Sequence, residues 1–168
     1  MSISEQLIAW RRELHQNPEL SGQEVETTAR LREWLTAAGI APLPYDLQTG
    51  LVAEIGTGNA LVALRADIDA LPIDERSGVP FSSRRAGVMH ACGHDIHTSV
   101  ILGAALKLKE REASLNGRVR ILFQPAEENF GGAKSMVRAG ALRDVRAMFG
   151  MHNEPSLPVG EFATRGGP

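Results

Sequence analysis

Apolar side chains recur at helical spacing in two stretches near the start of the chain. The two stretches carry their repeating positions at Ile3, Leu7, Trp10 and Leu14, and at Val25, Thr28, Leu31 and Leu35. Each is preceded by Ser-x-x-Glu, at 2–5 and at 21–24, which is the sequence of a capping box. Pro18 stops the first stretch, and Gly39 is a natural C-terminal cap for the second. The pattern therefore predicts two N-terminal helices.

Short apolar runs then alternate with helical spacing along the rest of the chain. Residues 51–55 and 60–64 are two such runs, and the turn residues between them predict a strand pair. The second run is continuously apolar, as expected of a central strand covered on both faces. Later segments predict helices at 95–110 and 131–139, strands at 119–124, 146–151 and 159–164, and a loop at 73–90. This alternation indicates an α/β fold, with a largely parallel mixed sheet and helices on both faces.

Acidic and imidazole side chains follow three of the predicted strands. Asp67 and Asp69 come after 60–64, Glu127 and Glu128 come after 119–124, and His152 comes after 146–151. Ligands of open α/β sheets bind at the carboxyl ends of the strands. We therefore expect these side chains to meet at one edge of the sheet.

A fourth group of candidate residues begins the helix predicted at 95–110. Cys92, His94, Asp95 and His97 lie there, within reach of the same edge, and Gly93 relaxes the backbone between the first two. A thiolate, imidazoles and carboxylates together suit zinc or a neighbouring first-row metal. Taken singly, each residue is more often inert, but ligand-type residues at four element ends together predict a metal site.

Other reaction classes fit the sequence less well. Cys92 and His94 are too close in sequence for the usual pairing of a thiol nucleophile with its base, which remains a minor alternative. Gly131–Gly132 lacks the Lys of a phosphate-binding loop. Gly56 to Gly58 joins two predicted strands, whereas the glycines of a dinucleotide-binding motif join a strand to a helix. The adjacent Glu127 and Glu128 instead suggest that one carboxylate binds metal while the other moves a proton.

Composition narrows the classes of partner. The chain has 168 residues, of which 43% are hydrophobic and 23% charged, with a net charge of -2 and one Cys, so we expect a globular domain without an internal disulfide. The small net charge argues against a nucleic-acid partner, because a duplex binder needs a basic face. We expect no signal peptide and no membrane span, hence a cytoplasmic protein.

Five motifs, in this order along the chain, resemble a known family. They lie at 14–20, 64–72, 89–97, 123–128 and 150–155, and the Cys-Gly-His-Asp-x-His and Pro-Ala-Glu-Glu stretches are the most specific. The chain resembles the di-metal amidohydrolases of the aminoacylase and carboxypeptidase type. It is most similar to their hippurate hydrolase, N-acyl-amino-acid hydrolase and auxin-conjugate hydrolase branch. The resemblance implies an incomplete zinc-exopeptidase-like catalytic domain that hydrolyses N-acyl amino acids.

The resemblance also implies individual roles. Cys92 corresponds to a thiolate that bridges two divalent metal ions, zinc or manganese, and Glu127 to the general base. His94, Glu128 and His152 correspond to terminal metal ligands. Asp69 corresponds to a carboxylate behind the ligands, and Asp67 stands where related carboxypeptidases place a metal-binding His. His97 and Asp95 are expected to orient the ligands. His15 is expected to be structural and far from the strand ends, and His90 could serve either role.

The family pattern further implies that residues 1–168 form the N-terminal part of a catalytic domain. A lid or dimerisation domain and the C-terminal part, which carries one more metal-binding His, are expected to be absent, and the full-length form is expected to be a homodimer. Three hypotheses follow. The chain is a metal-dependent amidohydrolase seen in part, a metal-binding remnant or scaffold protein without activity, or a compact hydrolase that uses one metal.

Overall fold

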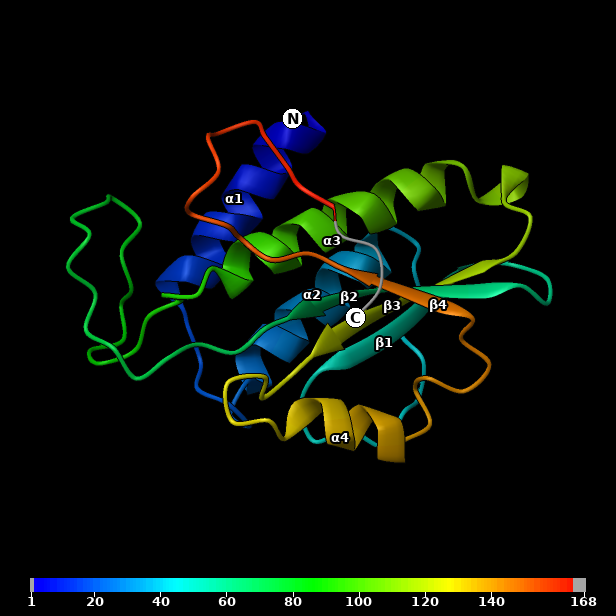
Figure 1. Ribbon diagram of the computed structural model, residues 1–168, viewed down its shortest axis with the longest axis horizontal. Coiled ribbons are helices and arrows are strands. Elements are labelled where there is room, and N and C mark those ends of the chain that lie inside the picture. The colour runs from blue at the N-terminus through cyan, green and yellow to red at the C-terminus, as the bar shows by residue number, and fades with distance from the viewer. Residues whose placement is uncertain (1, 165–168) are drawn as a thin grey trace.

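The computed structural model describes residues 2–164. The helices are α1 (Ile3–Gln16), α2 (Val25–Ala37), α3 (His94–Glu110), the short 3-10 helix η1 (Glu112–Ser114) and α4 (Gly132–Arg138). The strands are β1 (Leu51–Gly56), β2 (Leu61–Asp67), β3 (Arg118–Gln124) and β4 (Ala147–Gly150). Figure 1 shows the sheet with α1, α2 and α3 on one side and α4 on the other. The predicted α/β class with helices on both faces is confirmed.

The two N-terminal helices form as predicted, but only the first has the predicted cap. The Ser2 hydroxyl accepts from the Glu5 amide and the Glu5 carboxylate accepts from the Ser2 amide, which is a complete capping box. The second prediction is wrong, because α2 begins after Glu24 without a side-chain cap. The Ser21 hydroxyl instead donates to Asp69 at 2.6 Å. A tertiary contact therefore replaces the local one.

The sheet has the order β1-β3-β2-β4 among the described residues. β3 runs antiparallel to β1 and parallel to β2, and β4 runs parallel to β2 on its other side. The predicted pairing of 51–55 with 60–64 is therefore wrong, since β3 lies between these strands. The link between them passes around the start of β3, where Gly56 has a φ of 90° and an added Cβ would overlap the Gly117 carbonyl. Glycine permits this close approach.

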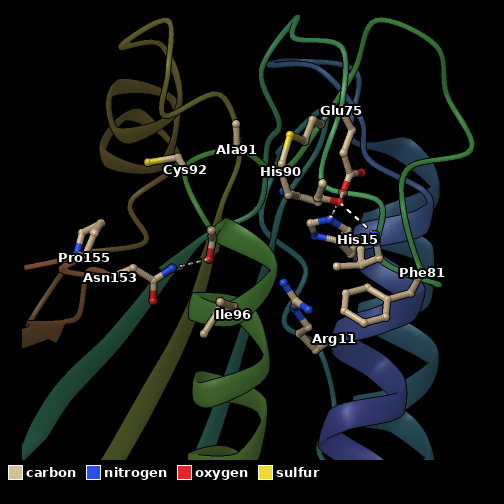
Figure 2. Close-up of a pocket in the computed structure, with 14 residues that line it drawn as sticks. Arg11, His15, Glu75, Phe81, His90, Ala91, Cys92, Ile96, Asn153 and Pro155 are labelled. Atoms are coloured by element: carbon tan, nitrogen blue, oxygen red, sulfur yellow. Dashed lines mark hydrogen bonds and ion pairs between the residues drawn. The ribbon is translucent and has the colours of Figure 1, made fainter. Parts of the chain in front are cut away.

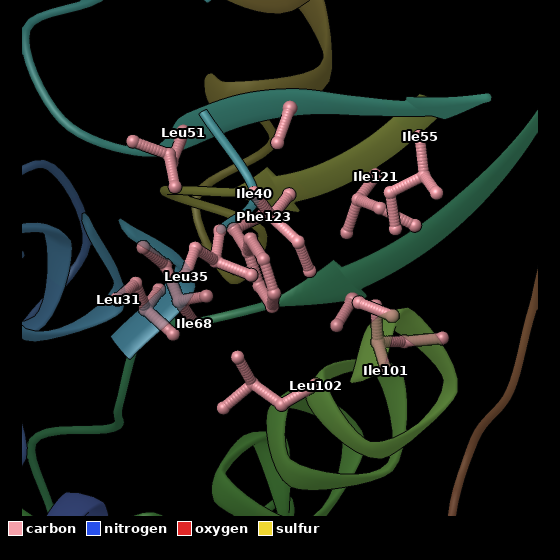
Figure 3. Close-up of a cluster of buried hydrophobic side chains, with 13 residues drawn as sticks. Leu31, Leu35, Ile40, Leu51, Ile55, Ile68, Ile101, Leu102, Ile121 and Phe123 are labelled. Atoms are coloured by element: carbon pink, nitrogen blue, oxygen red, sulfur yellow. The ribbon is translucent and has the colours of Figure 1, made fainter. Parts of the chain in front are cut away.

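The core is divided between the two faces of the sheet. The larger part joins α2 and α3 to the sheet and includes Leu35, Leu102 and Phe123 (Figure 3). α1 packs on α3, and its Trp10 stacks on Trp34 of α2 with ring centroids 4.8 Å apart. The smaller part lies under α4 and contains Val52, Ala63, Leu122, Met136 and Ala141. Both faces of β2 and β3 are therefore covered near the centre of the sheet, which explains the continuous apolar run at 60–64.

For the segments from residue 73 onward, some of the predicted elements are observed and others are not. The segment 73–90 has no helix or strand and forms a long loop, as predicted. β4 is shorter than the predicted strand 146–151, and its residues are exposed. The strand predicted at 159–164 is wrong, because this described segment contains only a turn at 159–160. Among residues 2–164, no helix combines the length and apolar character needed to cross a membrane.

Candidate metal centre

Side chains from two of the predicted element ends, the start of α3 and the end of β3, meet beside the carboxyl end of the sheet. Cys92 precedes α3, His94 begins it, and Glu128 follows β3. One ligand atom from each of these residues lies within 4.8 Å of the others. The structure thus brings Glu128, which follows β3, next to Cys92 and His94 at the start of α3, although Glu128 and Cys92 are 36 positions apart in the sequence. Their predicted roles as ligands can be judged from the atoms that they present.

His94 presents one ring nitrogen to this cluster. Its Nδ1 lies 2.9 Å from the backbone oxygen of Asp69 and 3.2 Å from Asp69 Oδ1. Because these oxygens only accept, Nδ1 carries a hydrogen, and in the neutral ring Nε2 keeps a free lone pair. Nε2 is buried without a hydrogen-bond partner among the described residues, and lies 3.6 Å from Glu128 Oε1 and 3.8 Å from Glu127 Oε2. An imidazole fixed in this way is prepared to bind a cation.

The turn that carries Glu127 and Glu128 is fixed by contacts on both sides. Ala126 has a φ of 49°, which is uncommon for a residue with a side chain. Its amide donates to the buried carboxylate of Glu24 at 2.7 Å, and the Glu128 amide donates to Asp69 at 3.0 Å. Glu128 Oε1 is buried without a hydrogen-bond partner in the described residues. Glu127 is more exposed than Glu128, which leaves its carboxylate accessible.

Cys92 lies between Glu128 and the predicted ligand His152. Its Sγ is 3.4 Å from His152 Nε2, while His152 Nδ1 lies 2.7 Å from the backbone oxygen of Asn153. His152 therefore also presents Nε2 to the cluster. Burial raises the pKa of Cys92 to about 11, and neighbouring carboxylates, Glu128 foremost, add to this shift. A bound divalent cation would reverse that preference, because it stabilises the thiolate.

Asp67, Asp69 and His97 lie directly behind these groups. Burial tends to raise the pKa of Asp69, but hydrogen bonds from His94, Ser21 and the Glu128 amide outweigh it and lower the pKa to about 2. Asp67 is buried, contacting Arg65 at 2.6 Å and His97 Nδ1 at 2.6 Å. Asp67, His94 and His97 form a second group whose ligand atoms lie close together. Asp69 is therefore a carboxylate that supports His94, and Asp67 supports His97.

Asp95 is directed away from this group, although it neighbours His94 in sequence. Its carboxylate lies 2.8 Å from Arg11 Nε and 2.8 Å from His15 Nδ1, both on α1. His15 Nε2 lies 3.0 Å from Glu75 of the loop 73–90 (Figure 2). His15 is buried, and it lines the same cavity as Cys92 instead of lying far from the candidate ligands. It joins the loop to the start of α3.

Arg11, His15 and Glu75 line a cavity of about 350 Å³, together with Cys92 and Gly93. His90 lies in its wall and is buried, and neither of its ring nitrogens has a hydrogen-bond partner among the described residues. Burial lowers the pKa of His90 to about 4, so its ring is neutral near pH 7. His90 belongs to neither group of candidate ligands. Its placement makes it part of the packing around the site.

His15 gives a testable pH dependence. The hydrogen bond with Asp95 raises the pKa of His15 against the opposing effect of burial, and Glu75 adds to the rise. A raised pKa stabilises the fold below the unfolded value of about 6.5, and this stabilisation is lost as the pH rises through the folded value. We expect the difference in free energy of unfolding between wild type and His15→Gln to shrink from about pH 6 to about pH 9. Urea unfolding at both pH values measures it, and an unchanged difference would contradict the assignment.

The donor set fits a divalent metal centre. It comprises a thiol, the Nε2 atoms of His94 and His152, and the Glu128 carboxylate, which are the ligand types that zinc binds. His94 Nε2 and Glu128 Oε1 are buried and have no partner among residues 2–164, which supports this fit, because such atoms are costly unless a partner satisfies them. The carboxylates also allow manganese. The residues from which the sequence predicts a metal site therefore also present their ligand atoms close together.

Two supporting residues were not predicted from the sequence. Glu24 was expected only to cap α2, and Asn153 was not singled out. Asn153 joins the His152 segment to α3, since its backbone amide donates to His97 Nε2 at 3.0 Å. The only sequence signal for Asn153 is its place beside His152 in the last motif, and Glu24 offers no signal of burial at all.

Comparisons with known proteins agree with the motifs. The sequence profile of peptidase family M20/M25/M40 matches residues 63–167. The N-acetylcysteine deacetylase of Bacillus subtilis (strain 168) is 52% identical over 165 residues, covering 96% of this chain and 43% of that protein. IAA-amino acid hydrolase ILR1-like 4 of Arabidopsis thaliana is 47% identical over 163 residues, covering 96% of this chain and 37% of that protein.

A solved structure gives the same result. The crystal structure of the Bacillus subtilis YxeP protein, described as a dinuclear metal binding peptidase from the M20 family, matches with a TM-score of 0.91 at 52% identity. The match covers 94% of this chain and 45% of that chain. This chain thus spans less than half the length of these relatives. The resemblance inferred from the motifs is confirmed, and the chain belongs to peptidase family M20/M25/M40.

Proposed function

We propose that this chain provides the metal-binding part of an amidohydrolase that cleaves N-acyl amino acids. The observation that carries the proposal is the convergence of Cys92, His94 and Glu128. His94 Nε2 is buried in this cluster and has no hydrogen-bond partner in the part of the chain that the structure describes. We propose that Cys92, His94, Glu128 and His152 would hold two divalent ions, zinc or manganese. The dinuclear metal centre named for the YxeP protein supports the number of ions.

In the proposed mechanism, bound divalent ions would polarise the amide carbonyl and acidify a water. Glu127 would take the proton from that water and deliver it to the nitrogen of the leaving amine. Its partly exposed carboxylate beside His94 suits this task, because it can reach both the site and an incoming substrate. Asp69 would hold His94 in the tautomer that binds through Nε2.

The proposed substrate class follows from the relatives. One is named an N-acetylcysteine deacetylase and another an IAA-amino acid hydrolase, and both names describe an acyl group on an amino acid. We propose hippurate-like N-acyl amino acids as substrates within this class. We also propose a cytoplasmic homodimer in which residues 1–168 correspond to the N-terminal part of the catalytic domain.

Metal analysis and hydrolysis assays test the proposal together. We expect the purified chain, dialysed against zinc or manganese, to hold two ions and to release amino acid from N-acetylcysteine or N-benzoylglycine. Replacing His94 with Ala should abolish ion binding, whereas replacing the exposed Glu33 with Gln should change neither measurement. An absence of bound metal would contradict the site. Bound metal without hydrolysis would contradict the enzyme and support a metal-binding remnant.

A further inference from the structure

We infer that Asn153 is a positioning residue which, together with His97, holds His152 in place beside Cys92. This inference rests on the proposed function, since it concerns how one proposed ligand is oriented. His152 itself is exposed and follows the end of β4 in a segment without helix or strand. Something other than regular secondary structure must therefore fix its ring.

Asn153 contacts the start of α3 at two points. Its backbone amide donates to His97 Nε2 at 3.0 Å. Its side-chain amide donates to the Gly93 oxygen at 3.3 Å, which is the dashed line beside Asn153 in Figure 2. Gly93 has a φ of 90°, and an added Cβ would overlap the Asn153 side chain. The position between the proposed ligands Cys92 and His94 therefore needs glycine both for its backbone angle and for the approach of Asn153.

His97 gives this contact a rigid base. The ring is fully buried, and its Nδ1 lies 2.6 Å from the buried carboxylate of Asp67, which also contacts Arg65. A backbone amide can only donate, so His97 Nε2 must accept and Nδ1 must carry the hydrogen. The Asp67 carboxylate accepts that hydrogen. Each hydrogen bond from Asp67 on β2 through His97 on α3 to the Asn153 amide therefore joins one donor to one acceptor.

Asn153 also contacts the proposed ligand His152. The Asn153 backbone oxygen accepts from His152 Nδ1 at 2.7 Å, which directs the lone pair of His152 Nε2 toward Cys92 Sγ. The ring of His152 also lies against His97, with centroids 4.8 Å apart. Asn153 therefore sets both the tautomer and the distance of His152. Without it, His152 would be attached only through the exposed segment on either side.

Cobalt titration of the 168-residue chain tests this role, with the absorption of cobalt bound to thiolate as the signal. Residues that orient metal ligands typically change metal affinity by about 10–100-fold. For the binding of one cobalt ion, we expect His97→Leu to lose affinity by a factor in this range and Asn153→Ala to lose less. His97→Gln should retain most of the affinity, because its amide can still donate to Asp67 and accept from Asn153. Asn59→Ala, at an exposed turn, is the matched control and should bind as wild type does.

The comparison of Leu with Gln separates positioning from packing. If His97 only filled space, the apolar Leu would serve as well as Gln, and equal affinities of these two variants would overturn the inference. Urea unfolding identifies a variant that fails to fold. Asn153→Ala provides a second test, because Asn153 is only partly buried. Wild-type affinity in Asn153→Ala, together with an unchanged His152 ring, would also overturn it.

A measurement on the metal-free chain keeps this inference separate from the proposed function. Nitrogen-15 NMR of the histidine rings should show the hydrogen of His152 on Nδ1 in wild type and a mixture of both tautomers in His97→Leu, which removes the acceptor of the Asn153 backbone amide. Asn153→Ala keeps its backbone oxygen and should show a smaller change of the same kind. A mixture already present in wild type would contradict the positioning role whether or not metal binds. If the wild type binds no cobalt, the proposed function fails, and the ring tautomers alone decide the role of Asn153.

Discussion

Replacing Glu127 with Gln is expected to lower the rate of hydrolysis of an N-acyl amino acid by about 10²–10⁴-fold, the range typical of a lost general base. Gln has nearly the same shape but cannot accept the proton of the attacking water. Bound metal should remain at the wild-type level, because His94 and Glu128 keep their side chains. Steady-state kinetics and metal analysis of the same sample provide the measurement.

The neighbouring glutamate supplies the contrast. Glu128→Gln should lose bound metal as well as activity, since the buried Glu128 Oε1 faces His94 Nε2 at 3.6 Å. Glu33→Gln, on the exposed face of α2, should change neither. Equal metal loss in Glu127→Gln and Glu128→Gln would show that the two carboxylates do not divide their tasks. Full activity in Glu127→Gln would exclude it as the base.

Replacing Glu24 with Ala is expected to lower the free energy of unfolding by about 3 kcal/mol or more, because a buried donor that loses its acceptor costs about 1–3 kcal/mol. The Glu24 carboxylate is fully buried and accepts from Gly22, Thr49 and Ala126. All three donors would lose this partner. The loss should also release the turn at Ala126, whose positive φ depends on its surroundings. Urea unfolding measures the stability.

Two variants bracket this prediction. Glu24→Gln keeps the volume and an acceptor oxygen for the Gly22 and Ala126 amides, so it should be destabilised less than Glu24→Ala. Glu26→Ala removes an exposed carboxylate that pairs with Arg30 on the same helix and with Arg85 of the loop 73–90, and it should cost about 1 kcal/mol or less. A Glu24→Ala chain as stable as Glu26→Ala would show that Glu24 does not hold the turn that carries Glu127.

The sequence predicted elements better than their pairing. Helical spacing located α1, α2 and α3, because burial of one helix face leaves a local pattern. The partner of a strand leaves no such pattern. Residues 51–55 and 60–64 looked like neighbours because turn residues join them, yet β3 from far along the chain lies between them. Likewise Ser21 and Glu24 match a capping box, but buried contacts with Asp69 and Ala126 replace it.

Some residues of the candidate site could likewise be predicted from the sequence, and others could not. Cys92, His94 and Glu128 could be proposed from the sequence because they are chemically distinctive and follow or precede predicted elements. Asn153 and Glu24 could not, since an amide and an acid reveal their roles only through the groups that they contact. Asp95 illustrates the converse, because its place beside His94 suggested a contact with the ligands, whereas its carboxylate is directed to α1. These outcomes depend on side-chain direction, which spacing alone does not determine.

The stacked pair of Trp10 and Trp34 affects how the chain can be observed. The chain has two tryptophans, and both belong to this contact between α1 and α2. Tryptophan emission should therefore follow the separation of these two helices, and circular dichroism should follow the helices and sheet as a whole. Coincident urea curves from the two signals would indicate that the N-terminal helices and the sheet unfold together. An earlier fluorescence transition would instead reveal a metal-binding sheet that persists after its first two helices have come apart.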